Sequence, residues 1–311
     1  MNRILRDYRK GPEGWLDFSG IKEKELGSLD QLIRSFRRVS VQRWEQTGKD
    51  DRKAFWMNAH LAVVLSQISK AYPVDGEKVR FLPRNSIQQI ESFWDTEFSF
   101  WKGRESLRSI EQKLLSEEFA DPAAVVVLYA GTVGGPPPPD EVWSGRSLDE
   151  QIERHLRKYM ESERGFRLDE AARRMWIPSP FFFWRADIVR LAPTGRREGE
   201  PPPFDERKKD PWNVYPVEEA RFLSFVAKFL SKSVVGRIQG RRYEIKELAF
   251  DWALADGTPP PKKPEGIPLD PEAPYKEWKE GEMPLAPVDH LPRKWKKKTP
   301  PGEIEPLFGD K

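Results

Sequence analysis

The sequence predicts a single α+β domain, mostly helical around a small, largely antiparallel sheet. Apolar residues recur at helical spacing in most patterned segments, whereas runs of β-branched residues are short and few. The 311 residues include 38% apolar side chains, with 12 Trp and 18 Phe, which suffice for one substantial core. We therefore expect a folded domain over residues 29–256, with an N-terminal arm over 1–28 and an extended, Pro-rich C-terminal tail over 257–311.

The first 28 residues are predicted to form an extended arm, because glycines recur there between large apolar side chains. Trp15 and Phe18 would hold this arm on the domain by packing their rings against it.

Two helices are predicted next, over residues 29–46 and 51–71. Ser28 can cap the first of them, with Gln31 three residues later as in a capping box. The second is apolar on most sides, which is typical of a buried helix. Helical spacing continues in four later segments. These cover residues 86–94, 106–118, 148–160 and 217–230.

Strands are expected where β-branched or aromatic runs are too short for helices. They cover residues 123–130, residues 181–189 and a hairpin over 234–245 with Gln239-Gly240 in its turn. Between them, residues 193–213 are rich in Pro, Gly and charge, which predicts an inserted surface loop.

Composition excludes several kinds of chemistry. Lys plus Arg number 53 against 50 Asp plus Glu, so the net charge of +3 predicts no general attraction to nucleic acid or membranes. The absence of Cys excludes disulfides, thiolate nucleophiles and Cys-ligated metals. No apolar run reaches the ~18–20 residues of a spanning helix, and no apolar block follows Met1. These features predict a soluble intracellular protein, in the cytoplasm or an organelle matrix.

An ordered set of short motifs runs from the second predicted helix to the end of the domain. It comprises Ala54 to Asn58, Phe93-Trp94, Ile110-Glu111, Asp121-Pro122, Val125 to Leu128, Gly131, Pro136-Pro137, Ser179, Trp184, Asp187 and Phe250 to Trp252. This pattern resembles the domain of unknown function 547 family over residues 29–256. The resemblance implies structural roles for seven positions, namely Trp56, Asn58, Glu111, Gly131, Asp187, Asp251 and Trp252.

The chain departs from the family where the resemblance places reactive side chains. A histidine and two cysteines of the family pattern align with Val125, Ala130 and Gly135, and another histidine aligns with Gln112. An imidazole beside a thiol could activate a nucleophile or bind a metal, so these replacements remove both options. We therefore expect no catalytic residue, no cofactor and no metal site.

The remaining polar candidates have simpler interpretations. We expect His60 to be a hydrogen-bonded core histidine, and His155 and His290 to be surface residues. Glu111 is expected to bond to Asn58 or to backbone donors, since a lone carboxylate lacks a partner for acid–base catalysis.

Three function hypotheses follow. The first is a non-catalytic structural or accessory subunit of a larger assembly, which binds other protein subunits through aromatic residues of the arm and tail. These anchors are Trp15, Tyr275, Trp278, Trp295 and Phe308. The second is an acid-dependent hydrolase in which Glu111 acts with Asn58 and Asp187 in a cleft. The third is a nucleic-acid tether through the basic segment from Arg293 to Lys298.

Overall fold

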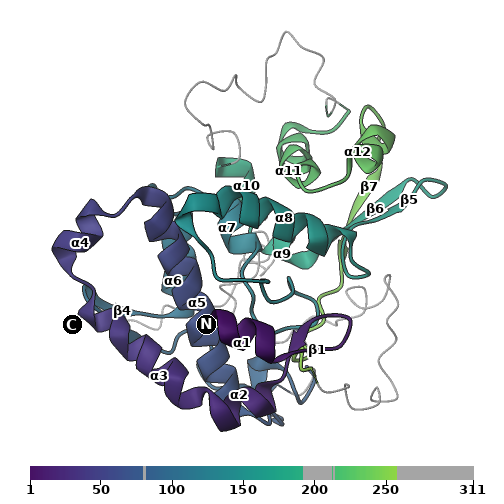
Figure 1. Ribbon diagram of the computed structural model, residues 1–311. Coiled ribbons are helices and arrows are strands. Elements are labelled where there is room, and N and C mark those ends of the chain that lie inside the picture. The colour runs from purple at the N-terminus through teal and green to yellow at the C-terminus, as the bar shows by residue number, and fades with distance from the viewer. Residues whose placement is uncertain (80–81, 192–211, 213, 258–311) are drawn as a thin grey trace, which may run out of the picture.

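The computed structural model describes residues 1–79, 82–191, 212 and 214–257. Within these ranges helices predominate and the strands form three small sheets, so the predicted α+β architecture is confirmed (Figure 1). None of the described helices is both long and apolar enough to cross a membrane.

The N-terminal arm is folded rather than extended. Helix α1 (Asn2–Asp7) leads into a two-stranded ribbon of β1 (Arg9–Lys10) and β2 (Trp15–Leu16), and helix α2 (Phe18–Lys24) follows. Phe18 is fully buried, which agrees with the predicted packing of the arm. The prediction of an extended backbone was wrong, because the side chain of Asp17 caps α2 and buried apolar residues draw both helices into the core.

The next predicted helix is divided. Helix α3 (Leu26–Ser35) passes into a 3₁₀ turn, η1 (Phe36–Arg38), and a separate short helix α4 (Val41–Gln46) begins after Ser40. Ser40 has an extended backbone and its hydroxyl accepts the Arg43 amide, so the residue starts a new helix instead of continuing the old one. The long helix predicted over 51–71 is confirmed as α5 (Lys49–Ala71), and 15 of its residues are buried.

The middle of the chain confirms one predicted helix and corrects two predictions. Residues 86–94 contain only the 3₁₀ turn η2 (Ile87–Gln89), followed by turns and the hairpin of β3 (Phe98–Phe100) and β4 (Gly103–Glu105). Helix α6 (Leu107–Leu115) is present as predicted, with Ser106 in a capping box. The strand predicted over 123–130 is instead helix α7 (Pro122–Val126).

Local capping explains why the valine run is helical. The Asp121 carboxylate accepts the amides of Ala123 and Ala124, and Pro122 occupies the first turn, where its missing N–H is harmless. These two start signals outweigh the weak β-propensity of Val125 and Val126.

The C-terminal half is built on helix α8 (Leu148–Glu161), which follows η3 (Gly145–Ser147) and confirms its prediction. A three-stranded sheet orders β5 (Arg167–Asp169), β6 (Arg174–Pro178) and β7 (Glu244–Leu248), with β5–β6 antiparallel and β6–β7 parallel.

Around this sheet, two strand predictions were wrong and one helix prediction is confirmed. Residues 181–189 fall in helices α9 (Ser179–Phe183) and α10 (Arg185–Leu191), and α9 has Pro180 in its first turn. Helix α11 (Val217–Ala227) is confirmed. Helix α12 (Lys232–Ile238), capped by Ser231, replaces the first arm of the predicted hairpin, while β7 pairs with β6.

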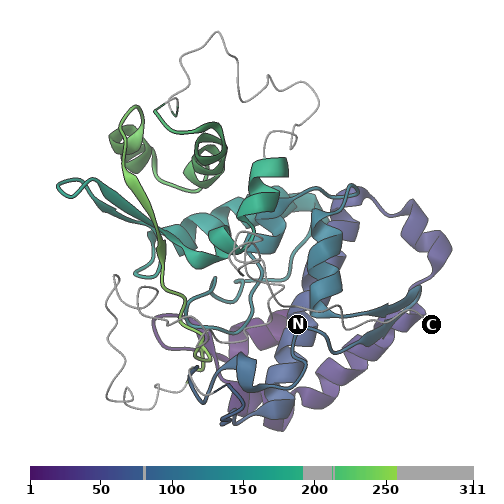
Figure 2. The ribbon, with the colours of Figure 1, turned by 180° about the vertical axis from the view of Figure 1, so that it is seen from behind.

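The last described residues join the two halves of the domain. Single β-bridges link Ala253 to Ser86, Leu254 to Thr132 and Asp256 to Leu16. This final segment lies against both halves of the domain (Figure 2). Of the predicted insertion over 193–213, only Trp212 is described, and it is buried.

Candidate functional site

Three of the four positions that the resemblance marks as reactive lie on α7 and in the loop after it, and the fourth, Gln112, lies on α6. Val125 and Gly135 are buried and Ala130 is partly buried. Their side chains offer hydrocarbon or none at all, so acid–base or nucleophilic chemistry at this place would need groups from elsewhere.

A buried acid–base pair does lie nearby, between α5 and α6. The Nε2 atom of His60 is 3.6 Å from Oε1 of Glu111, and their side chains are only 1% and 7% exposed. Neither ring nitrogen of His60 has a hydrogen-bond partner among the described residues, and the same holds for Oε2 of Glu111. His60 is therefore in the core as predicted, but the expected hydrogen bond is missing, and Glu111 does not bond to Asn58.

Asn58 has a different and specific role. Its Nδ2 donates to the Trp143 carbonyl oxygen at 2.8 Å, and its Oδ1 accepts the Trp143 amide at 2.9 Å. Both ends of the side-chain amide are thus used to hold the loop before α8 on α5.

Asn58 and His60 also point in different directions. Residues two positions apart in an α-helix are separated by about 200° around its axis. Since Asn58 faces the Trp143 loop and His60 faces Glu111, the two polar groups lie on opposite sides of α5.

Three other positions implied by the resemblance make local contacts. Asp187 pairs with Arg190 one turn along α10 at 2.8 Å. The Oδ1 atom of Asp251 accepts the amide of Ala253 at 2.9 Å. Trp252 stacks against Phe183 with ring centroids 6.0 Å apart. Each of these contacts fixes local backbone or packing.

Gly131 occupies a position that favours glycine. Its φ is +78°, and a Cβ atom there would lie 2.3 Å from Cδ1 of Ile68, which is fully buried. A side chain here would strain the backbone and displace Ile68, so glycine is favoured where this loop approaches α5.

Trp56 belongs to an aromatic cluster that the sequence did not predict. Its six members, from η1, α4, α5 and the β3–β4 hairpin, are Phe36, Trp44, Phe55, Trp56, Phe100 and Trp101. Centroid distances within the cluster are as short as 4.5 Å, between Trp44 and Trp101. Lys113 lies over the Trp56 ring at 5.3 Å, so the cluster is closed on that side by a cation.

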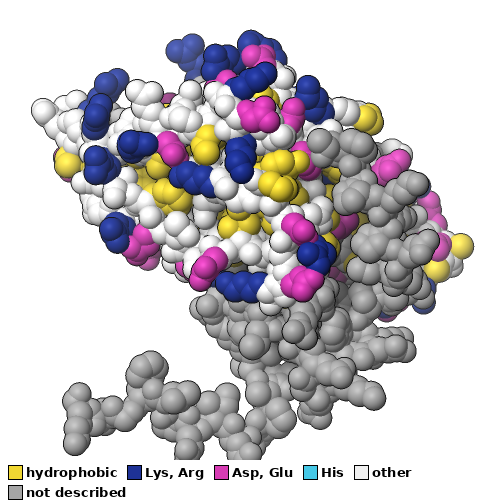
Figure 3. All heavy atoms as spheres, turned by 90° about the horizontal axis from the view of Figure 1, so that it is seen from below, with side chains coloured by type: hydrophobic (Ala, Val, Ile, Leu, Met, Phe, Trp, Pro, Cys, Tyr) yellow, Lys and Arg dark blue, Asp and Glu magenta, His cyan; other side chains and the backbone are white. Residues whose placement is uncertain are grey.

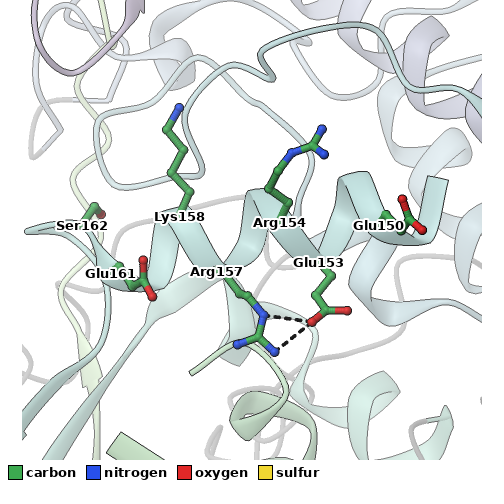
Figure 4. A pocket seen from close by; sticks show the side chains of 7 residues that line it. All are labelled: Glu150, Glu153, Arg154, Arg157, Lys158, Glu161 and Ser162. Carbon is green, nitrogen blue, oxygen red and sulfur yellow. Dashed lines mark hydrogen bonds and ion pairs between the residues drawn. The ribbon is translucent and has the colours of Figure 1, made fainter. Parts of the chain in front are cut away.

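A groove of about 730 Å³ runs along the exposed face of α8 (Figure 4). It is lined by Glu150, Glu153, Arg154, Arg157, Lys158, Glu161 and Ser162. Arg157 pairs with Glu153 in the groove, while Arg154 and Lys158 pair with Glu141 and Asp140 beside it. Because each of these three cations is paired with a carboxylate, the groove offers no unpaired positive charge to an anionic ligand.

His155 lies on the inner side of α8, so its predicted surface position was wrong. It is 5% exposed, and its Nε2 is 2.9 Å from the carbonyl oxygen of Pro137. Burial lowers the pKa of His155 to about 4, although the Pro137 carbonyl and the Asp140 carboxylate oppose the change. The residue is neutral at physiological pH, donates to Pro137 and has a structural position.

The predicted docking anchors are only partly described. Trp15 is half-buried in β2, with the Arg164 guanidinium 5.5 Å from its ring, so it is not an exposed anchor. Tyr275, Trp278, Trp295 and Phe308 lie outside the described residues, as do His290 and the basic segment from Arg293 to Lys298.

Sequence reasoning also missed an exposed group of arginines on α3, η1 and α4. Arg34, Arg37, Arg38 and Arg43 have no ion pair to any residue that the structure describes. The spacing of three and four residues from Arg34 to Arg37 and Arg38 was a usable signal, because it places side chains on one helix face.

No family model, curated protein or solved structure matches this chain. The resemblance to the domain of unknown function 547 family therefore stays a prediction. The described residues also contain no group of three or more His, Asp or Glu side chains that could hold a metal ion.

Proposed function

We propose that this chain is a non-catalytic structural or accessory subunit of a larger intracellular protein assembly. In this proposal it is a divergent relative of the domain of unknown function 547 family that has kept the scaffold and lost the reactive side chains. The proposal includes the tail anchors Trp278 and Trp295 as contacts to other subunits.

The main support comes from the contacts of Glu111, Asn58 and Asp187. The three side chains that an acid-dependent hydrolase would have to bring together are each engaged elsewhere. Glu111 is buried against His60 on one side of α5, and Asn58 is bonded to Trp143 on the other. Asp187 is paired with Arg190 on α10.

Substrate access gives further support. The groove on α8 and a smaller cavity beside Pro139 are not lined by Glu111, Asn58 or Asp187. A general acid must come within hydrogen-bond reach of a reacting group, directly or through one water. Neither of these two pockets would bring a substrate to this trio.

The proposal is tested by isolating the tagged full-length chain from its source cell and measuring the mass of the native particle. We expect a heteromeric assembly, and we expect Trp278→Ala/Trp295→Ala to reduce co-purification of its other subunits. Lys262→Ala/Lys263→Ala, in the same tail but without an aromatic change, is the matched control and should leave co-purification unchanged.

Two results would overturn the proposal. One is recovery of the chain as a free monomer under conditions that preserve other assemblies. The other is turnover of a small-molecule ester, amide or glycoside that Glu111→Gln abolishes while circular dichroism shows an intact fold.

A further inference from the structure

The arginines of α3, η1 and α4 form an unusual surface. Arg34, Arg37, Arg38 and Arg43 are all exposed, and Glu45 is the one carboxylate in the stretch from Arg34 to Gln46. Elsewhere in the described chain, exposed arginines are commonly paired, as in Arg84–Asp75 and Arg154–Glu141.

The segment that carries these arginines is itself weakly held. Helix α4 has no buried residue, and its first residue, Val41, is one of the two large apolar side chains that are exposed in the described chain, at 46%. Figures 1 and 2 show α4 at the margin of the molecule, away from the helices α3 and α5 that it connects. This position leaves its outer face accessible to a partner.

Aromatic contacts nevertheless hold the inner side of the segment in place. Trp44 of α4 packs on Trp101 at 4.5 Å and meets the edge of Phe55 at 5.3 Å, while Phe36 of η1 stacks on Phe100 at 5.2 Å. Because the backbone is anchored in this way, less conformational entropy is lost when the arginines meet a ligand.

The charge arrangement carries a cost in the isolated chain. Arg37 and Arg38 follow Arg34 by three and four residues, and like charges at this spacing destabilise a helix by about 0.2–0.5 kcal/mol per pair. No described carboxylate relieves that repulsion. A ligand that brings negative charge would relieve it.

We propose that this surface, the arginine edge formed by Arg34, Arg37, Arg38, Val41 and Arg43, binds an acidic segment of a partner protein. The proposal rests on the proposed function and names the chemistry of one partner. Arginine suits carboxylates because its planar guanidinium can make two parallel hydrogen bonds to one carboxylate. Val41 supplies an apolar contact between the charges.

Two other anionic partners fit the arginine edge less well. Single-stranded nucleic acid is gripped by aromatic faces on which bases stack, but Trp44, Phe55 and Trp101 pack against one another here. Membrane-bound helices of this kind insert a broad apolar face, whereas α4 exposes Val41 alone among its large aliphatic residues. A protein segment needs neither feature.

The test is a fluorescence-anisotropy titration of the full-length chain with a labelled peptide of alternating Glu and Asp around two leucines. We expect saturable binding that weakens as salt is added, and a loss of about tenfold or more in affinity for Arg37→Glu/Arg38→Glu. Lys232→Glu/Arg167→Glu, on α12 and β5, changes the net charge equally at a distant surface and should retain most of the affinity.

Further variants and probes make the outcome decisive. Arg37→Lys/Arg38→Lys keeps the charge but removes the guanidinium groups that can make two parallel hydrogen bonds to one carboxylate, so we expect an intermediate loss of affinity. Circular dichroism of each variant verifies its fold. The inference is overturned if the acidic peptide does not bind, or if both charge-reversal pairs weaken it equally. It is also overturned if oligo-dT or phosphatidylserine vesicles bind the arginine edge more tightly than the peptide does.

Failure of this inference is separable from failure of the proposed function. The titration uses only the purified chain and a synthetic peptide, whereas the assembly is detected by mass and co-purification. If the chain co-purifies with other subunits but does not bind acidic peptides, the proposed function stands and the inference about the arginine edge fails.

Discussion

Asn58 on α5 is joined to the backbone of Trp143 by two hydrogen bonds, one in each direction, across 85 positions of sequence. Trp143 is buried, so its amide and carbonyl would be left without partners if the side-chain amide were removed. An unsatisfied buried polar group costs about 1–3 kcal/mol. This contact therefore fixes the loop that leads into α8.

We expect Asn58→Ala to lower the free energy of unfolding by about 2–4 kcal/mol, measured by urea denaturation. Asn2→Ala is the matched control, because Asn2 makes a single exposed hydrogen bond to Val142 in the same loop. It should cost less than about 1 kcal/mol. Equal losses for both variants would mean that the paired hydrogen bonds to Trp143 stabilise the fold no more than the single bond of Asn2 does.

Gly131→Ala should be more damaging than the same change at another glycine with positive φ. Both Gly131 and Gly240 are in the left-handed region, at +78° and +67°, where alanine costs about 1–2 kcal/mol. Gly240 has open space around it, whereas a methyl group at Gly131 meets the buried Ile68 and adds about 1–3 kcal/mol of overpacking. The difference between the two free energies of unfolding isolates the contact with Ile68, and a difference near zero would contradict it.

The sequence analysis correctly predicted the helices that have strong local sequence signals. Helices α5, α6, α8 and α11 have long apolar periodicity or caps, and such local information survives in almost any tertiary setting. It predicted less well where short segments are ambiguous. The valines of α7 and the phenylalanines of α9 are residue types typical of strands. Both segments are nevertheless helical, because Asp121 caps α7 and Pro180 lies in the first turn of α9.

The candidate site was predictable in its members but not in its contacts. The motif order singled out Asn58 and Glu111, and both make specific interactions. Their partners, Trp143 and His60, could not be read from local spacing because they depend on how distant elements pack on α5. The aromatic cluster around Trp44 was missed for the same reason, since its rings come from four separate elements.

The His60–Glu111 pair should show strong energetic coupling. Removing one partner leaves the other buried without this contact, so His60→Leu and Glu111→Leu should each cost about 1–3 kcal/mol. Replacing both with leucine removes the two polar groups together and should cost about 1–3 kcal/mol less than the sum of the single changes. A double-mutant cycle in urea measures the difference. Strict additivity would show that the 3.6 Å contact contributes nothing.

Lys53 tests whether burial strengthens an ion pair in this fold. Its Nζ lies 2.8 Å from Asp121 and 3.5 Å from Asp149, and its side chain is only 8% exposed. Burial alone would lower the pKa of Lys53, but attraction to Asp121 and Asp149 outweighs it and raises the pKa. The lysine is therefore charged in the folded state and holds the residue that caps α7.

We expect Lys53→Met to cost about 2–4 kcal/mol, since it leaves the Asp121 carboxylate without its partner. The matched control is Lys70→Met, which breaks an equally short pair with Asp30 at 2.7 Å in which the lysine is 48% exposed. Exposed pairs contribute about 0–1 kcal/mol, so the control should be nearly neutral. Thermal melts that fall by the same amount in both variants would contradict a special role for the buried pair.

A partly buried glutamate and a buried histidine should give the stability of this protein opposing pH dependences. Glu247 on β7 is held largely out of water, which raises its pKa from 4.5 to about 7 despite the Ser179 hydroxyl and the Arg185 charge. Its folded form binds the proton more tightly than the unfolded chain, so the stabilisation is complete below pH 4.5 and is lost as pH rises to about 7. His155, with a pKa lowered from 6.5 to about 4, behaves in the opposite way, because its stabilisation is complete above pH 6.5 and is lost as pH falls to about 4.

Each group is expected to change the free energy of unfolding by up to about 3 kcal/mol, and between pH 4.5 and 6.5 the two slopes largely cancel. Glu247→Gln should therefore uncover a stability that rises with pH over this window, and His155→Gln should uncover one that falls. Urea titrations at several pH values measure the slopes directly, independent of any constant cost of the substitutions. If the Glu247→Gln profile runs parallel to that of the parent chain, Glu247 is ionised in the folded state throughout the window and its burial does not hold the proton.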